Sequence, residues 1–373
     1  MNIGIVQEER KNESRVSIIP ETILKFPKHN FSIVKDAGLK SGFYDQEYKN
    51  SGARIVENNK ELISQNELII SVNALDRDYY KNFLQNSILI SNFETFINTD
   101  SIKNLIENNI TSLALERIPR IARAQSMDVL SSQASVSGYK SVLIAASKLN
   151  KYFPMLMTAA GTIPPAKVLI LGAGVAGLQA IATAKRLGAS VTAFDVRKEV
   201  KEQVESLGAK FLGMDTLEDS QEKSGYAKEL STDETKSTSD FLYSSIIQSD
   251  CVITTAMIPG KKSPILINKK SVENMKKGSV IIDLAAERGG NCELTKQNKT
   301  IIHNEIYIIG TLNIPSTMPY HASQLLSKNM ESLLNLLLEN ENINLNFEDE
   351  IINELCLTHD HEDRHNLLTK KRN

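Results

Sequence analysis

The chain has 373 residues, of which 41% are hydrophobic and 24% charged, and its formal net charge is -2. This length suggests two domains, and the composition is that of an ordinary globular protein with enough apolar residues for sizeable cores. A nearly neutral chain lacks the basic footprint of nucleic-acid binding, so no nucleic-acid partner is expected.

The three cysteines lie far apart without metal-site spacing. This favours reduced thiols in a cytosolic protein and predicts no bound metal. Because the first residues lead directly into a strand-like segment, no signal peptide is expected. No apolar run reaches the roughly 18 residues of a membrane span. We therefore expect a soluble protein that could still dock on a membrane partner.

The first third of the chain alternates short apolar runs with helix-like stretches. Strands are predicted near residues 2–6, 31–38, 53–56, 67–73, 87–93 and 110–116. Strands separated by helical stretches are typical of a mainly parallel sheet with helices on its faces.

A helical pattern follows from about Ser126 to Leu149, long enough to bridge two lobes. Gly161, Pro164 and Pro165 then favour an extended or turn backbone.

A second α/β region begins at residue 167, with further apolar runs at 251–258, 279–287 and 306–314. Residues 215–240 contain almost no aliphatic side chains, which predicts a mobile loop followed by a polar helix. The chain is expected to end with a helix at 322–339 and a polar, frayed tail.

A glycine fingerprint opens the second region. Gly172, Gly174 and Gly177 have G-x-G-x-x-G spacing between an apolar run and a helix-like segment. This pattern permits a tight turn, close approach of a pyrophosphate and close helix–strand packing, with phosphates at the helix N-terminus. Asp195 follows at the distance of a ribose-binding carboxylate, which favours NAD over NADP, while Arg197 could soften that preference. The other expected cofactor contacts here are Val175, Ala176 and Val196.

Thr255, Ala256 and Met257 follow another strand-like run and are candidate cofactor contacts by position. Ligands of open α/β sheets bind beyond the carboxyl ends of the strands. Close packing of small residues explains such a segment equally well.

The segment PRIARAQSMDVLSSQ, residues 119–133, carries a more specific signal. Together with the fingerprint, it resembles the NAD(H)-binding alpha subunit, or domain I, of proton-translocating NAD(P) transhydrogenases. GIVQEERKNESRVSIIPET, SGYAKEL, DCVITTAMIPGKKSPILI and GSVIIDLAAERGGNCELT extend the resemblance over about nine tenths of the chain.

The resemblance implies a direct hydride transfer from NADH to NADP held on a separate component, so no substrate hydroxyl must lose a proton. Proximity and orientation of two nicotinamide rings then supply much of the acceleration. Arg120, Gln125 and Asp128 match the catalytic loop over the NADH nicotinamide, with Asp128 paired to Arg120 and Gln125 directed toward both rings. Ser131 matches a carboxamide contact.

The remaining cofactor-binding residues implied by the resemblance are Ile121, Ala122, Arg123, Gly225 and Tyr226. Tyr226 matches a mobile loop that closes over the nucleotide. From the residues alone, arginines before a helix are usually solvated, and a surface Arg–Asp pair contributes only about 0–1 kcal/mol.

The resemblance also implies two Rossmann-like lobes with parallel sheets, joined by long helices. The N-terminal lobe would comprise residues 1–136 and 321–373, and the NAD-binding lobe residues 137–320. The expected partners are a second copy of the chain, an NADP-binding membrane beta subunit and a small membrane-spanning alpha-2 subunit. These would place the protein on the cytoplasmic face of the inner membrane, with NAD(H) bound here and NADP(H) on the partner.

Two other functions stay open. Alanine dehydrogenases share the fold, but they need a lysine and a histidine for proton transfer. Residues 71–74 and 92–94 hold neither, although Arg15, the carboxylate-binding arginine, is present. An NADH-sensing module without chemistry is the third possibility, and it would have no need for Gln125 to face an acceptor ring. A polar tail explains His359, His361 and His365 better than a metal site does.

Overall fold

The computed structural model describes residues 1–94, 99–213, 232–257, 261–340 and 342–368. The chain forms two compact units, Met1–Gln133 with Pro315–Asn373, and Ala134–Ile314. The sequence-based limits, at 136 and 320, differ from these by several residues.

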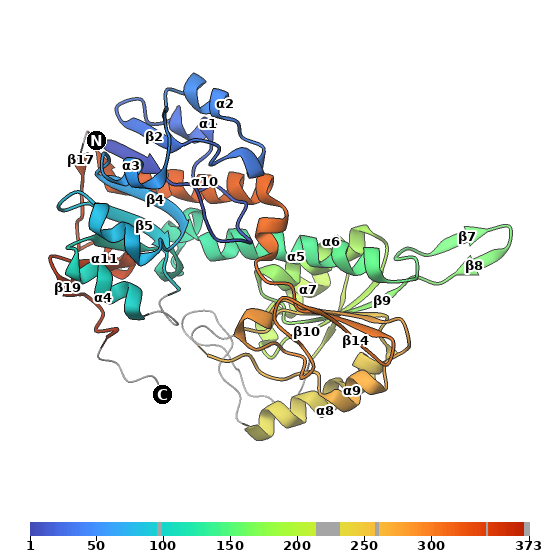
Figure 1. Ribbon diagram of the computed structural model, residues 1–373. Helices are drawn as coiled ribbons and strands as arrows, with labels where there is room; N and C mark the ends of the chain where they lie inside the picture. The colour runs from blue at the N-terminus through green and yellow to red at the C-terminus, as the bar shows by residue number, and fades with distance from the viewer. Residues whose placement is uncertain (95–98, 214–231, 258–260, 341, 369–373) are drawn as a thin grey trace. The chain divides into compact units, whose positions relative to one another are not determined.

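Unit 1 contains one mainly parallel sheet (Figure 1). Within the described residues its strand order is β19-β18-β6-β5-β4-β1-β2-β3, with only β18 and β19 antiparallel to their neighbours. The order reverses between β1 and β4, as in doubly wound sheets. The strands are β1 (Asn2–Ile5), β2 (Asn30–Val34), β3 (Arg54–Val56), β4 (Leu68–Asn73), β5 (Ile88–Asn92), β6 (Thr111–Ala114), β18 (Cys356–His359) and β19 (Glu362–Asp363).

Helices from both ends of the chain complete unit 1. They are α1 (Pro20–Ile23), α2 (Asp45–Asn50), α3 (Asn59–Ile63), α4 (Thr99–Glu107), α10 (Pro319–Leu337) and α11 (Glu350–Leu355). The C-terminal helix α10 buries Leu326, Met330, Leu333 and Leu337 in the core of this unit. Their helical spacing explains why α10 returns to unit 1. The short antiparallel pair β16 (Leu338–Glu339) and β17 (Asn342–Ile343) follows α10.

Unit 2 holds a sheet of order β11-β10-β9-β12-β13-β15-β14, in which only β14 runs antiparallel among the described strands. Val168 and Ile170 of β9 face one apolar cluster, and Leu169 and Leu171 face another. The first cluster includes residues of α5 and α6, and the second residues of α8 and α9, so helices cover both faces. Burial on both sides explains the continuous apolar runs in the sequence.

The strands of unit 2 are β9 (Lys167–Leu171), β10 (Ser190–Phe194), β11 (Lys210–Leu212), β12 (Cys251–Thr254), β13 (Val280–Asp283), β14 (Thr300–His303) and β15 (Ile306–Ile309). The helices are α6 (Val175–Arg186), α7 (Lys201–Ser206), α8 (Thr232–Gln248) and α9 (Lys269–Glu273), together with α5 (Val129–Lys148), which begins in unit 1 and continues into unit 2 at Ala134. A hairpin of β7 (Leu156–Thr158) and β8 (Gly161–Ile163) extends away from this sheet (Figure 1).

Short 3-10 turns connect several of these elements. They are η1 (Leu39–Ser41), η2 (Arg77–Asn82), η3 (Leu115–Arg117), η4 (Ala122–Met127), η5 (Lys198–Val200), η6 (Ala286–Arg288) and η7 (Ile314–Thr317).

The predicted fold class, two Rossmann-like lobes with parallel sheets and long helices, is confirmed. The predicted frayed tail is wrong, because Ile351, Ile352, Leu355 and Leu357 are buried in α11 and β18. In the described residues, no helix combines the length and the apolar character that crossing a membrane would require.

Candidate functional site

The glycine fingerprint forms the turn between β9 and α6 in unit 2. Gly172 has φ +101°, a backbone conformation that glycine adopts without strain. A Cβ on Gly177 would lie 1.9 Å from the carbonyl oxygen of Gly172, so this position has no room for a side chain. At Gly174, by contrast, an added Cβ would meet no atom of the described residues within 4 Å.

This turn lies where the strand order of unit 2 reverses. β9 pairs with β10 on one side and with β12 on the other. Gly174 is the N-cap of α6, so the first amide groups of a 12-residue helix begin beside the open position. Unpaired amides and the positive end of the helix dipole suit a phosphate. The residues present therefore fit the pyrophosphate of a dinucleotide.

Asp195 follows β10 at the same end of the sheet and is buried. Its Oδ2 accepts a hydrogen bond from the amide of Ala173 at 2.7 Å, which ties it to the glycine turn. The guanidinium of Arg197 donates to both carboxylate oxygens at 2.9 Å, and its amide donates to Oδ1. These hydrogen bonds raise the pKa of Arg197. These four hydrogen bonds occupy the roughly four acceptor sites of a carboxylate, so a ribose hydroxyl would have to displace one of them.

Thr255 continues β12 beside the glycine turn. Its amide donates to the carbonyl of Leu171 at 2.8 Å, and its Oγ1 donates to the carbonyl of Gly172 at 3.0 Å. A Cβ on Gly172 would lie 2.5 Å from that Oγ1. The structure thus brings together the predicted residues of the glycine turn and those at the end of β12, while Met257 is exposed.

Two buried residues that were not selected from the sequence hold this segment. Asn291 donates from Nδ2 to the carbonyl of Ala256 at 2.8 Å and accepts from the amide of Ala256 at 3.1 Å. Asp283 at the end of β13 accepts from the amide of Asn291 and from the hydroxyls of Thr254 and Thr295. The available signal was the acidic end of an otherwise apolar strand run, VIID.

The predicted catalytic loop lies in unit 1, between β6 and α5. Asp128 precedes α5 and accepts from the amide of Ser131 at 2.9 Å and from its hydroxyl at 2.6 Å. Asp128 thus caps the helix, a role that its position alone could have suggested. Its predicted pairing with Arg120 stays a prediction. Gln125 and Arg120 are exposed on the loop.

Of four further residues of the prediction, two lie in the described part of the chain and two do not. Ile121 is half-buried and Ala122 exposed at the start of η4. Gly225 and Tyr226 lie outside the described residues.

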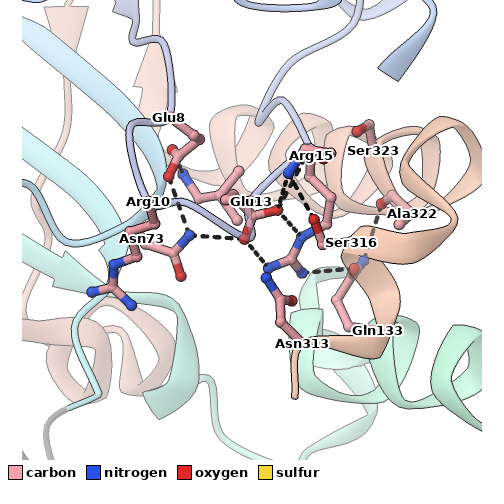
Figure 2. Close-up of polar contacts among 12 residues, drawn as sticks. Glu8, Arg10, Glu13, Arg15, Asn73, Gln133, Asn313, Ser316, Ala322 and Ser323 are labelled. Carbon is pink, nitrogen blue, oxygen red and sulfur yellow. Dashed lines mark hydrogen bonds and ion pairs between the residues drawn. The ribbon is translucent and has the colours of Figure 1, made fainter. Parts of the chain in front are cut away.

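A buried charged cluster occupies the reversal point of the unit 1 sheet, where β1 and β4 end (Figure 2). Arg15 donates to both oxygens of Glu13, at 2.8 and 2.7 Å, and to Oε1 of Gln133 at 2.9 Å. Nδ2 of Asn73 donates to Oε2 of Glu8 and to Oε2 of Glu13. The position that holds the glycine turn in unit 2 is therefore filled by the protein's own side chains in unit 1.

The two carboxyl groups of this cluster differ in pKa. Burial raises the pKa of Glu8 from 4.5 to about 7, despite hydrogen bonds from the amides of Val72 and Asn73. Burial alone would also raise that of Glu13, but its hydrogen bonds from Arg15 lower it to about 2. At neutral pH, Glu13 is thus the charged partner of Arg15, and Glu8 is the group that titrates.

Comparison with known proteins gives consistent matches. Residues 4–137 match the family model "Alanine dehydrogenase/PNT, N-terminal domain", and residues 141–366 match "Alanine dehydrogenase/PNT, C-terminal domain". The chain is 42% identical over 366 residues to a protein of Rickettsia prowazekii that is named as one part of the NAD(P) transhydrogenase subunit alpha, covering 96% of this chain and 95% of that protein.

Two solved structures are also similar. The transhydrogenase from Sinorhizobium meliloti has a TM-score of 0.85 at 36% identity, covering 97% of this chain and 98% of the other. An L-alanine dehydrogenase has a TM-score of 0.82 at 23% identity, covering 99% of both, and this likeness shows the fold alone.

Proposed function

This chain belongs to the family of NAD(P) transhydrogenase alpha subunits, which share their two domains with alanine dehydrogenases, and we propose that it binds NAD(H) and exchanges hydride directly between NADH and NADP+ held on a partner subunit. The observation that carries the nucleotide half of this proposal is the turn after β9, with its open position at Gly174 before the helix α6. Bound NADH would supply the hydride.

The residues of unit 2 would bind and orient the nucleotide. The N-terminus of α6 would hold the pyrophosphate, and Asp195 the adenosine ribose. Thr255, fixed against the glycine turn, would keep the end of β12 in place beside the bound nucleotide. None of these groups has to transfer a proton.

The loop of unit 1 would govern the hydride step. Following the family resemblance, Arg120 and Asp128 fix the loop, and Gln125 faces the dihydronicotinamide and its acceptor ring. Such a site accelerates the reaction by orienting two rings and excluding water. An amide side chain suits this role, because it forms hydrogen bonds without changing charge.

The alanine dehydrogenase alternative lacks support from side-chain chemistry. Asn73, in the segment where that enzyme would need its lysine, donates its amide to two carboxylates and cannot act as an acid or base. Arg15, the carboxylate-binding residue of that alternative, is already paired with Glu13.

We extend the proposal to the assembly. Two copies of the chain would pair, and each would dock on an NADP-binding membrane beta subunit and a small membrane-spanning alpha-2 subunit, on the cytoplasmic face of the inner membrane. Proton translocation would be performed by those subunits, with NADP(H) held there. Support comes from the relatives' names, which describe alpha subunits of a transhydrogenase.

Gln125→Asn tests the proposal, because it keeps the amide but withdraws it by one methylene group. NADH affinity, followed by nucleotide fluorescence, should stay nearly unchanged, while hydride transfer to the NADP-loaded partner domain should slow. Gln203→Asn on the exposed surface of α7 makes the same chemical change at a residue that belongs to neither predicted site and serves as the control. Loss of NADH binding in Gln125→Asn would refute the role assigned to Gln125.

A further inference from the structure

The loop that carries Gln125 is held by the C-terminal segment of the chain. Within η4, Ala124 and Met127 are buried in the core of unit 1, where they join Met330 of α10. Gln125 stays exposed between them. Packing therefore holds one side of η4, and polar contacts determine how tightly the rest of the loop is held.

The first polar contact is an ion pair between Arg123 and Asp349. Nη1 and Nη2 of Arg123 donate to Oδ2 and Oδ1 of Asp349 at 2.6 and 2.8 Å, so the guanidinium and the carboxylate meet side by side. Asp349 is also the N-cap of α11, because its Oδ1 accepts from the amide of Ile351 at 2.8 Å. The capping bond already restricts the Asp349 side chain, so forming the ion pair with Arg123 costs less conformational entropy.

The second contact comes from α10. Nδ2 of Asn329 donates to the main-chain carbonyl of Ser126 at 2.7 Å. Asn329 is buried, so a competing water cannot easily replace this bond. The two contacts grip the loop on either side of Gln125, one through a side chain and one through the backbone.

We propose that Asp349 and Asn329 are positioning residues for the loop that carries Gln125, and that Arg123 acts through Asp349 rather than by contacting the nucleotide. This inference rests on the proposed function, and it revises the role that the family resemblance implied for Arg123. The Arg123 side chain is 53% exposed, so salt should weaken this grip. The loop is thus held firmly by Asn329 and only loosely by Asp349.

Hydrogen exchange of the peptide amides in residues 120–128 tests the grip without nucleotide or activity. We expect exchange to rise roughly 2- to 5-fold in Asp349→Asn and equally in Arg123→Gln, as for an exposed ion pair. The double variant should add nothing further, because both changes remove one interaction. Asparagine is as good an N-cap as aspartate, so α11 should remain intact.

Glu354→Gln is the matched control. Glu354 lies in the same helix α11 that Asp349 caps, and it forms an ion pair with Arg117. This substitution should leave exchange of the loop unchanged, and an equal rise there would assign the effect to α11 as a whole. Unchanged exchange in Asp349→Asn would refute the claim that Asp349 holds the loop. In Asn329→Asp, which keeps the size but loses the donor, exchange should rise further than in Asp349→Asn.

Hydride transfer to the NADP-loaded partner domain supplies the second readout. Asp349→Asn should lower kcat about 2- to 5-fold at an unchanged KM for NADH, and Arg123→Gln should match it. A raised KM in Arg123→Gln alone would restore Arg123 as a nucleotide contact. If exchange rises but kcat does not fall, the positioning role is wrong while the proposed function stands. A wild-type chain without hydride transfer would refute the proposed function, and the exchange data would still decide on the grip.

Discussion

Replacing Glu8 with glutamine should stabilise the chain at pH 8 much more than at pH 5. Glu8 lies in the charged cluster of unit 1, where its Oε1 accepts from the amide of Val72 at 2.6 Å and its Oε2 from Asn73 at 3.1 Å. Glutamine keeps the size and can still accept from Val72, but it carries no charge. The change therefore isolates the cost of ionising this carboxyl group inside the fold.

The magnitude follows from the pKa of Glu8, which burial raises from 4.5 to about 7. Below pH 4.5 both the folded and the unfolded chain carry this proton, and the group costs nothing. Between pH 4.5 and 7 the unfolded chain loses the proton first, so the free energy of unfolding falls as pH rises. At about 1.4 kcal/mol per pH unit the full loss approaches ~3 kcal/mol. Because Glu8 is half-buried, we take this value as an upper limit.

Urea denaturation followed by circular dichroism measures the effect, as the chain contains no tryptophan for fluorescence. The quantity to compare is the change in unfolding free energy between pH 5 and pH 8, because constant effects of the substitution cancel there. We expect the wild type to lose about 2–3 kcal/mol more than Glu8→Gln over this range. Glu107→Gln on the exposed side of α4 is the control. Equal losses in wild type and Glu8→Gln would refute this account of the cluster.

Three further changes probe unit 2. Gly174→Ala should fold normally but lose most NADH affinity, because its Cβ would enter the space for the pyrophosphate; unchanged affinity in a fluorescence titration would exclude that site. Gly177→Ala should instead lower the melting temperature, since its Cβ would lie 1.9 Å from a main-chain oxygen, and a normal melting curve would contradict the packing. Asp195→Ala should weaken NADH binding, and an unchanged affinity would remove Asp195 from the ribose site. The same change should speed hydrogen exchange at Ala173, whose amide loses its acceptor.

The features that could be predicted from sequence are those with local causes. The spacing of Gly172, Gly174 and Gly177 predicts a turn because two of its causes are local: the positive φ of Gly172 and the close approach of Gly177 to the carbonyl of Gly172. The fully buried strands of unit 2 were equally visible, since burial on both faces requires an unbroken apolar run.

The features that escaped prediction depend on distant segments. The partner of Arg123 lies 226 residues away, and no local pattern connects Arg123 with Asp349. The apolar residues of α11 and β18 did leave a signal in IINELCL, residues 351–357, but polar neighbours hid it. Asn73 was interpreted only as the absence of a lysine, whereas the structure shows an amide that bridges Glu8 and Glu13.

The most direct test of the proposed function is hydride exchange from NADH to an oxidised NAD analogue. It should be measured with and without an NADP(H)-loaded partner domain from the family, beside a reaction of NAD with L-alanine. We predict exchange only when the partner domain is present and no reduction of NAD by alanine. Reduction of NAD by alanine would show an alanine dehydrogenase. No hydride transfer in any of these reactions, with NADH still bound, would indicate a nucleotide sensor.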